Sequence, residues 1–135
     1  MERIPEPNAA VEFHDSEVQS LVVNVDGATL RLSAYVHRSA GEPGSDPGSG
    51  WVQEATLTIR RAVVSGSLPQ LPRVLYDASA IVGKVSCGGL LPAPFVGNGT
   101  VEFSMQFDEG SEVQIRGFDL RLELIGLAEF IEEVH

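Results

Sequence analysis

His14 and Asp15 are the first residues along the chain whose types suggest a chemical site. They stand side by side in the stretch Val11-Glu-Phe-His-Asp-Ser-Glu-Val18. A histidine next to an aspartate can serve as a base with its orienting carboxylate, or as two metal ligands. Adjacent residues on an extended strand point to opposite faces, however, so the two cannot easily act on each other. In a turn, Asp15 can accept a backbone hydrogen bond from two residues further on. The pattern therefore favours a corner where a strand begins, with Phe13 as an apolar plug.

A metal site would need more ligands than this pair. The chain has three histidines, His14, His37 and His135, and none of them falls in an HxH or HExxH spacing. His14, Asp15 and His37 would meet only if the first two strands pair in a suitable register. A small-ligand or metal site of the jelly-roll kind at these three residues stays open as the alternative hypothesis, while no metal and no cofactor is predicted.

Nucleophilic catalysis finds little support in the residue pattern. Serines are plentiful, but none stands in the Gly-x-Ser-x-Gly elbow of a serine hydrolase. The single cysteine, Cys87, excludes an intramolecular disulfide and a multi-cysteine zinc site, and its apolar and glycine neighbours indicate a small buried side chain. The neighbouring carboxylates Asp108-Glu109 and Glu132-Glu133 are typical of a solvated turn and a solvated chain end. We predict no catalytic residue and no enzymatic activity.

The charge of the chain limits its partners. Nineteen acidic residues against nine Lys and Arg give a formal net charge of −10, and only Arg60-Arg61 are adjacent basic residues. Such a surface repels phosphate groups, so neither nucleic acid nor a membrane is an expected partner. It favours another protein, a basic one, and a homo-oligomer remains open. Residues 1–7 lack the pattern of a secretory signal, and no apolar run approaches the length of a membrane helix, so a cytoplasmic protein is expected.

The dominant hydrophobic period is two. In residues 28–37, Leu30, Leu32, Ala34 and Val36 share one face and polar residues share the other. This alternation predicts a strand with one packed and one solvated face, and Asp26-Gly27 before it predicts a tight hairpin turn. Further alternating runs give seven to nine strands. The sequence predicts an all-β, antiparallel two-sheet sandwich or jelly-roll-like fold, with a flattened barrel as the alternative. Residues 1–135 form one domain, in which residues 1–10 and 40–50 are expected to be flexible.

Several segments are less regular. Residues 51–60 predict a strand that residues 61–65 extend or bend through a bulge. Residues 75–79 suggest a short helical turn, residues 80–87 a strand, and residues 88–99 an irregular crossing. Residues 101–107 and 113–125 alternate clearly, with a bulge expected at Gly117. Residues 128–134 fit either a strand or a single helical turn.

The polar strand faces carry the other functional signal. One such face, that of residues 29–35, includes Tyr35, and tyrosine is enriched at protein–protein hot spots. Either this surface is a solvated face that resists edge-to-edge aggregation, or it binds a protein partner with Tyr35 as an anchor. The candidate binding residues are His14, Asp15, Tyr35 and His37.

The order of several short motifs suggests a relationship. The chain contains Phe13-His-Asp-Ser16, Gly50-Trp51, Gly99-Thr-Val-Glu-Phe103, residues 115–122 (IRGFDLRL) and Phe130-Ile-Glu-Glu133. In this order, over residues 11–134, they resemble an uncharacterised family of small bacterial all-β proteins with an N-terminal Phe-His-Asp-Ser motif. That family is loosely similar to β proteins grouped with toxin-immunity proteins. The resemblance implies a binding role by analogy and transfers no catalytic residue.

Overall fold

The structure, a computed structural model, describes residues 3–135. Within this range the chain forms eight strands and no helix. Accordingly, those residues contain no helix long and apolar enough to cross a membrane. The strands are β1 (Asn8–Asn24), β2 (Gly27–Ser39), β3 (Gly48–Gly66), β4 (Arg73–Val82), β5 (Val85–Gly88), β6 (Leu90–Ala93), β7 (Phe95–Phe107) and β8 (Glu112–Val134).

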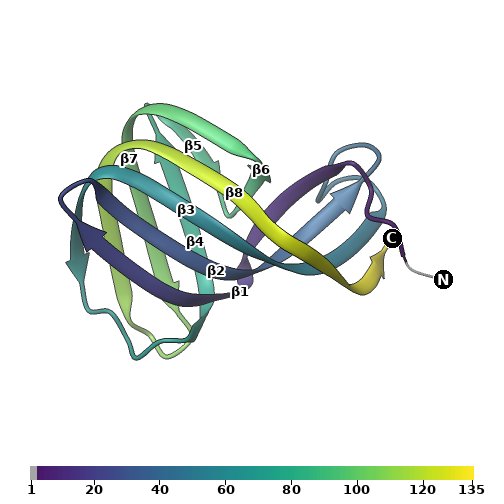
Figure 1. Cartoon of the computed structure of the whole chain (residues 1–135), viewed down its shortest axis with the longest axis horizontal. Coiled ribbons are helices and arrows are strands. Elements are labelled where there is room, and N and C mark those ends of the chain that lie inside the picture. The colour runs from purple at the N-terminus through teal and green to yellow at the C-terminus, as the bar shows by residue number, and fades with distance from the viewer. Residues whose placement is uncertain (1–2) are drawn as a thin grey trace.

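All strand pairs are antiparallel and belong to one hydrogen-bonded sheet, in the order β5-β4-β7-β8-β3-β2-β1-β6 (Figure 1). A further short pairing joins β4 to β1, at Glu17 with Val74 and Val18 with Arg73, so the sheet closes on itself. The predicted all-β, antiparallel class and the strand number are confirmed. The division into two separate sheets is not confirmed, because hydrogen bonds link every strand into one sheet, as in the flattened-barrel alternative.

The core lies inside the closed part of the sheet and follows from the period-two pattern. Leu30 of β2 pairs with Leu57 of β3, and Leu57 pairs with Leu122 of β8, so one row of inward leucines crosses three strands. All three are at most 1% exposed. Phe13 from β1 and Phe103 from β7 meet edge to face with ring centroids 5.2 Å apart. Burial of each such side chain contributes about 1.5–3 kcal/mol.

Four long strands continue beyond the closed part and form a second, smaller part of the molecule near both chain ends (Figure 1). We call it the terminal lobe; it consists of residues 8–12, 35–39, 48–53 and 126–134. Its interior is partly polar. Trp51, 2% exposed, donates its indole N–H to Ser49 Oγ at 2.6 Å, and Gln53, 7% exposed, accepts from Arg38 at 3.0 Å. Burial lowers the pKa of Arg38, but the guanidinium stays a cation and donates to Gln53 Oε1 at 3.0 Å and to the carbonyl of Glu6 at 3.2 Å.

The hairpin at the β1–β2 turn is confirmed, with a shift of one residue. Val25 and Asp26 form the turn, Asn24 pairs with Gly27, and the side chain of Asn24 accepts a hydrogen bond from the N–H of Asp26 at 2.9 Å. The bulge expected after residue 60 is present, where Arg61 takes a positive φ of 50° and the β3–β8 register shifts.

Other expectations were wrong in detail. Residues 75–79 belong to β4 rather than to a helical turn, and residues 90–98 contain β6 and the start of β7. Of the two alternatives for residues 128–134, the strand is the correct one, because β8 runs to Val134. Residues 8–10 and 48–50, which we expected in flexible segments, lie in β1 and β3. The physical reason is pairing on both sides, since β1 is flanked there by β2 and β6, and β3 by β2 and β8.

Candidate functional site

The His14–Asp15 stretch lies in the middle of β1, not at its start. The pairing of β1 with β2 shifts between Glu12 and Glu17, which defines a bulge at residues 13–16. Asp15 takes a φ of +74°, a left-handed conformation that aspartate tolerates better than most residues. Ser16 fills the bulge. Its hydroxyl donates to the carbonyl of Glu12 at 2.6 Å and accepts from the N–H of Tyr35 at 2.9 Å. The corner is thus a built bend within a long strand.

His14 joins β1 to β4 with its side chain. Its Nδ1 lies 2.5 Å from the carbonyl oxygen of Tyr76, close to the point where the backbone pairing of these two strands ends. Its Nε2 lies 3.5 Å from Asp15 Oδ1. The hydrogen bond to Tyr76 and the charge of Asp15 raise the pKa of His14. Both ring nitrogens therefore have partners, and the role that the geometry shows for His14 is to hold the seam.

Tyr35 and His37 stand on the outward face of β2, where they engage one carboxylate on each side. Tyr35 donates its hydroxyl hydrogen to Glu132 Oε1 of β8 at 2.6 Å, and His37 Nε2 lies 3.1 Å from Glu12 Oε2 of β1. The two rings meet edge to face with centroids 5.0 Å apart. Burial, and then the hydrogen bond to Glu132, raise the pKa of Tyr35 far above its usual value, so Tyr35 stays protonated and acts as a donor.

Gly50 makes this row possible. Tyr35 must cross β3 to reach β8, and the strand position under its ring is Gly50. A Cβ at Gly50 would lie 2.1 Å from the Tyr35 hydroxyl oxygen and 2.8 Å from its Cζ, so only glycine leaves room for the ring. We call Glu12, Tyr35, His37, Gly50 and Glu132 the polar row. It spans β1, β2, β3 and β8.

The polar row belongs to a strongly acidic surface. Strand pairing places the outward residues of β1, β2, β3 and β8 in rows that cross the sheet. We call the area between the row that contains Arg31 and Glu123 and the row that contains His37 and Glu132 the acidic face. Arg31 is its one guanidinium group and pairs with Glu54 at 3.0 Å. Its carboxylates are Glu12, Glu17, Glu54, Glu123, Glu129 and Glu132.

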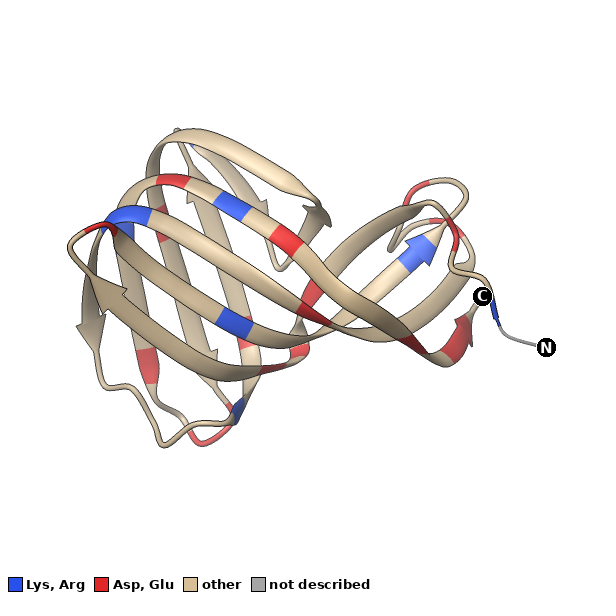
Figure 2. Cartoon of the chain, viewed as in Figure 1, with Lys and Arg blue, Asp and Glu red and all other residues tan. Residues whose placement is uncertain are grey.

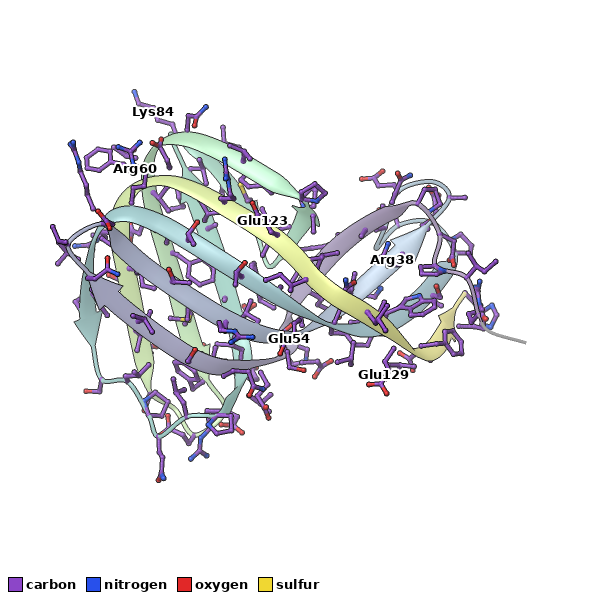
Figure 3. The ribbon with its side chains drawn as sticks, viewed as in Figure 1. Arg38, Glu54, Arg60, Lys84, Glu123 and Glu129 are labelled. Carbon is purple, nitrogen blue, oxygen red and sulfur yellow. The ribbon has the colours of Figure 1, made fainter. Side chains whose placement is uncertain are left out.

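The figures show how this charge is distributed. Acidic positions outnumber basic ones where the closed part of the sheet passes into the terminal lobe and along the end of β8 (Figure 2). Glu54 and Glu129 project from the same side of the ribbon, whereas Arg38 lies within the terminal lobe (Figure 3). The half-buried Arg38 of the lobe therefore does not neutralise the acidic face.

The three residues of the ligand-site alternative are not gathered into one site. His14 is bound to β4, Asp15 is exposed in the bulge, and His37 turns to Glu12. Across residues 3–135, no group of three or more His, Cys, Asp or Glu side chains has the arrangement to hold a metal ion. Cys87 is half-buried rather than buried, with its thiol 3.8 Å from the Val85 carbonyl.

Two shallow hollows of about 410 Å³ each open on the outer surface of β3, β4, β7 and β8. The first is lined by both polar and apolar side chains, among them Ser79, Ser104 and Met105, and the second includes Phe118 and Arg116. None of the four predicted binding residues lines either hollow.

Sequence reasoning named Tyr35 and His37 as candidates but missed the side chains that contact them. Glu12, Gly50, Glu132 and Ser16 come from other strands or from the bulge, and only the three-dimensional register brings them together. Gly50 in front of Trp51 was the one available signal, because a glycine within a strand often marks close approach of another group.

Comparison of the chain with protein-family models, with curated proteins and with solved structures finds no match. The resemblance to the Phe-His-Asp-Ser family therefore stays a prediction.

Proposed function

We propose that this protein is a non-catalytic binding protein that presents its acidic face to a basic protein partner. The observation that carries the proposal is the polar row. Tyr35 and His37 each hold a carboxylate in place, at 2.6 Å from Glu132 and 3.1 Å from Glu12. Side chains that are already ordered lose less conformational entropy on binding than free ones.

The charge of the acidic face indicates which kind of partner it would bind. Arg31 pairs with Glu54 at 3.0 Å, and Arg121, just outside the acidic face, pairs with Glu123 at 3.6 Å. The six carboxylates still outnumber these two guanidinium groups, so the face attracts a basic surface and raises its association rate, and the attraction weakens as salt screens it. A basic toxin domain is the kind of partner that the resemblance to immunity-type proteins implies. A second copy of this chain would bring like charges together at this face, which disfavours homo-oligomerisation through it.

The test compares two double charge reversals in pull-down experiments from a lysate of the source cells, with mass spectrometry of the bound proteins. Glu54→Lys with Glu129→Lys changes the acidic face. Glu102→Lys with Glu112→Lys makes the same change in net charge on β7 and β8, outside it. A partner bound at about 50 mM salt should be lost on screening at about 500 mM. It should also be lost with the first variant and retained with the second.

The proposal is wrong if the partner remains bound to the first variant while both variants melt at the wild-type temperature. It is also wrong if the two variants lose the partner equally, because the effect then comes from net charge rather than from the acidic face. The melting temperature separates loss of binding from loss of folding.

A further inference from the structure

A bulge in β8 lifts one apolar side chain out of the sheet beside the acidic face. Ile125 pairs with Glu54 and Glu129 pairs with Val52, so residues 126–128 stand opposite the single residue Gln53. Gly126 takes a φ of +73°, which only glycine adopts without strain. The buried Gln53 donates its side-chain amide to the carbonyl of Gly126 at 2.9 Å and so ties down the base of the bulge.

Leu127 at the tip of this bulge is 95% exposed. Three more large apolar residues within four positions of it on the same strand are also exposed, Ile125 at 40%, Phe130 at 40% and Ile131 at 51%. Single exposed apolar residues are common on protein surfaces, but an apolar group rimmed by charged residues marks an interaction site more often. Three carboxylates of β8 lie within five residues of Leu127 along the strand, namely Glu123, Glu129 and Glu132. Two of them, Glu123 and Glu129, are labelled on β8 in Figure 3.

The backbone edge of β8 beside Leu127 does not suit the addition of another strand. β7 pairs with β8 only up to Leu122, so the following residues have no strand partner on that side within residues 3–135. Register shifts at residues 126–128 and at Ile131 interrupt the ladder, and bulges of this kind protect an edge from strand pairing. A partner must therefore recognise the side chains of this segment rather than its backbone.

We propose that Leu127 is the anchor through which the acidic face docks its partner, and that the partner surrounds Leu127 with an apolar pocket bordered by Lys and Arg side chains. The inference rests on the proposed function and names the partner's surface. Charge complementarity selects this occupant, because the apolar group stands among carboxylates. A second copy of the chain would place Glu129 and Glu132 against their own counterparts.

The experiment selects disulfide-cyclised peptides from a displayed random library against the full-length protein at about 50 mM salt. The binding of the enriched peptides is then measured by calorimetry with the wild type, with Leu127→Ala and with Val25→Ala. Val25 is the matched control, because it is 93% exposed, as Leu127 is, but lies in the β1–β2 turn at the far end of the sheet. Neither truncation removes a packed side chain, so both variants should melt as the wild type does.

The expected result is enrichment of peptides that combine Lys or Arg with large apolar residues. Their affinity should fall at least tenfold with Leu127→Ala and less than twofold with Val25→Ala. If the peptides bind Leu127→Ala and Val25→Ala with equal affinity, Leu127 is not the anchor. If such peptides still lose binding with Glu54→Lys and Glu129→Lys, the proposed function stands without the anchor. Selection of peptides that lack basic residues overturns both proposals. The wild type is also examined by sedimentation. If it sediments as a dimer and Leu127→Ala sediments as a monomer, the partner at Leu127 is a second copy of the chain rather than a basic protein.

Discussion

The steric relation between Gly50 and Tyr35 makes a sharp prediction about stability. In the wild type, Gly50→Ala pushes the Tyr35 ring away, because the new Cβ would lie 2.1 Å from the hydroxyl oxygen. Displacement of the ring breaks the hydrogen bond to Glu132. Hydrogen bonds to charged groups contribute about 1.5–3 kcal/mol, and partial exposure of this one lowers the expected loss to about 1–2 kcal/mol.

A second effect acts in the opposite direction. Replacement of a strand glycine by alanine restricts the unfolded chain and contributes about 0.5–1 kcal/mol to stability. Gly50→Ala alone should therefore lower the free energy of unfolding by up to about 1.5 kcal/mol, from the two magnitudes above. In a Tyr35→Ala background the remaining close neighbour is Glu132 Cγ, 3.3 Å from the new Cβ, which needs to move by only a few tenths of an ångström. The same Gly50→Ala change should therefore raise the free energy of unfolding by up to about 1 kcal/mol. The sign of the effect reverses between the two backgrounds.

Urea unfolding at 25 °C, followed by the fluorescence of the single tryptophan Trp51, measures all four free energies of the cycle. Trp51 is 2% exposed and adjacent to Gly50, so its emission reports unfolding of the terminal lobe. We expect a coupling energy of about 1–2 kcal/mol between positions 35 and 50. Coupling below about 0.5 kcal/mol would refute the reasoning, since it would mean that Tyr35 does not depend on the space above Gly50.

Three further predictions concern the seam, the bulge and the core. Because the pKa of His14 is raised in the folded protein, its contribution to stability is complete below the unfolded pKa near 6.5 and is lost as pH rises through the folded pKa. His14→Gln should therefore flatten the pH dependence of the melting temperature between about pH 6 and 8. An unchanged profile would contradict the role of His14 at the seam. Ser16→Ala leaves the carbonyl of Glu12 and the N–H of Tyr35, both half-buried, without their partner and should cost about 1–3 kcal/mol in urea unfolding. Ser86→Ala at an exposed position should cost less than about 0.5 kcal/mol. Leu57→Ala should cost about 2–5 kcal/mol, and a smaller loss would show that the closed sheet collapses around the missing side chain.

Local pattern was sufficient wherever each strand had one packed and one solvated face. The alternation of residues 28–37 and 101–107 predicted strands that the structure contains, and Asp26-Gly27 predicted the hairpin. Pattern failed at residues 75–79 because a register shift between Leu75 and Asp77 exposes both Tyr76 and Asp77. Two successive exposed residues break the alternation, so the segment no longer looks like a strand.

The candidate site was less predictable because its contacts span the whole chain. Tyr35 and Glu132 are 97 residues apart, and His37 and Glu12 are 25 apart. No local signal specifies which strands are neighbours or in which register they pair. Closure of the sheet through β4 and β1 depends on two residue pairs at a seam, which hydrophobic period does not reveal.

Irregular positions on three of the four strands of the acidic face lie around one row of the sheet, formed by Glu12, Tyr35, Val52 and Glu129, in addition to those near Ser20 and Arg61 at the far end. The β1 bulge follows Glu12 directly. On β3, register shifts flank Val52, and the β8 bulge ends at Glu129. Some bulges are needed for four strands to bend out of the closed part into the terminal lobe. The bend does not explain three other features of this region. It does not require a glycine at position 50 to make room for Tyr35, or the fixed carboxylates Glu12 and Glu132. It also does not require that Leu127 be exposed to solvent. Departures from local rules without a folding benefit concentrate where a protein meets its ligand. This row is therefore where variants that abolish binding but preserve the melting temperature should be sought first.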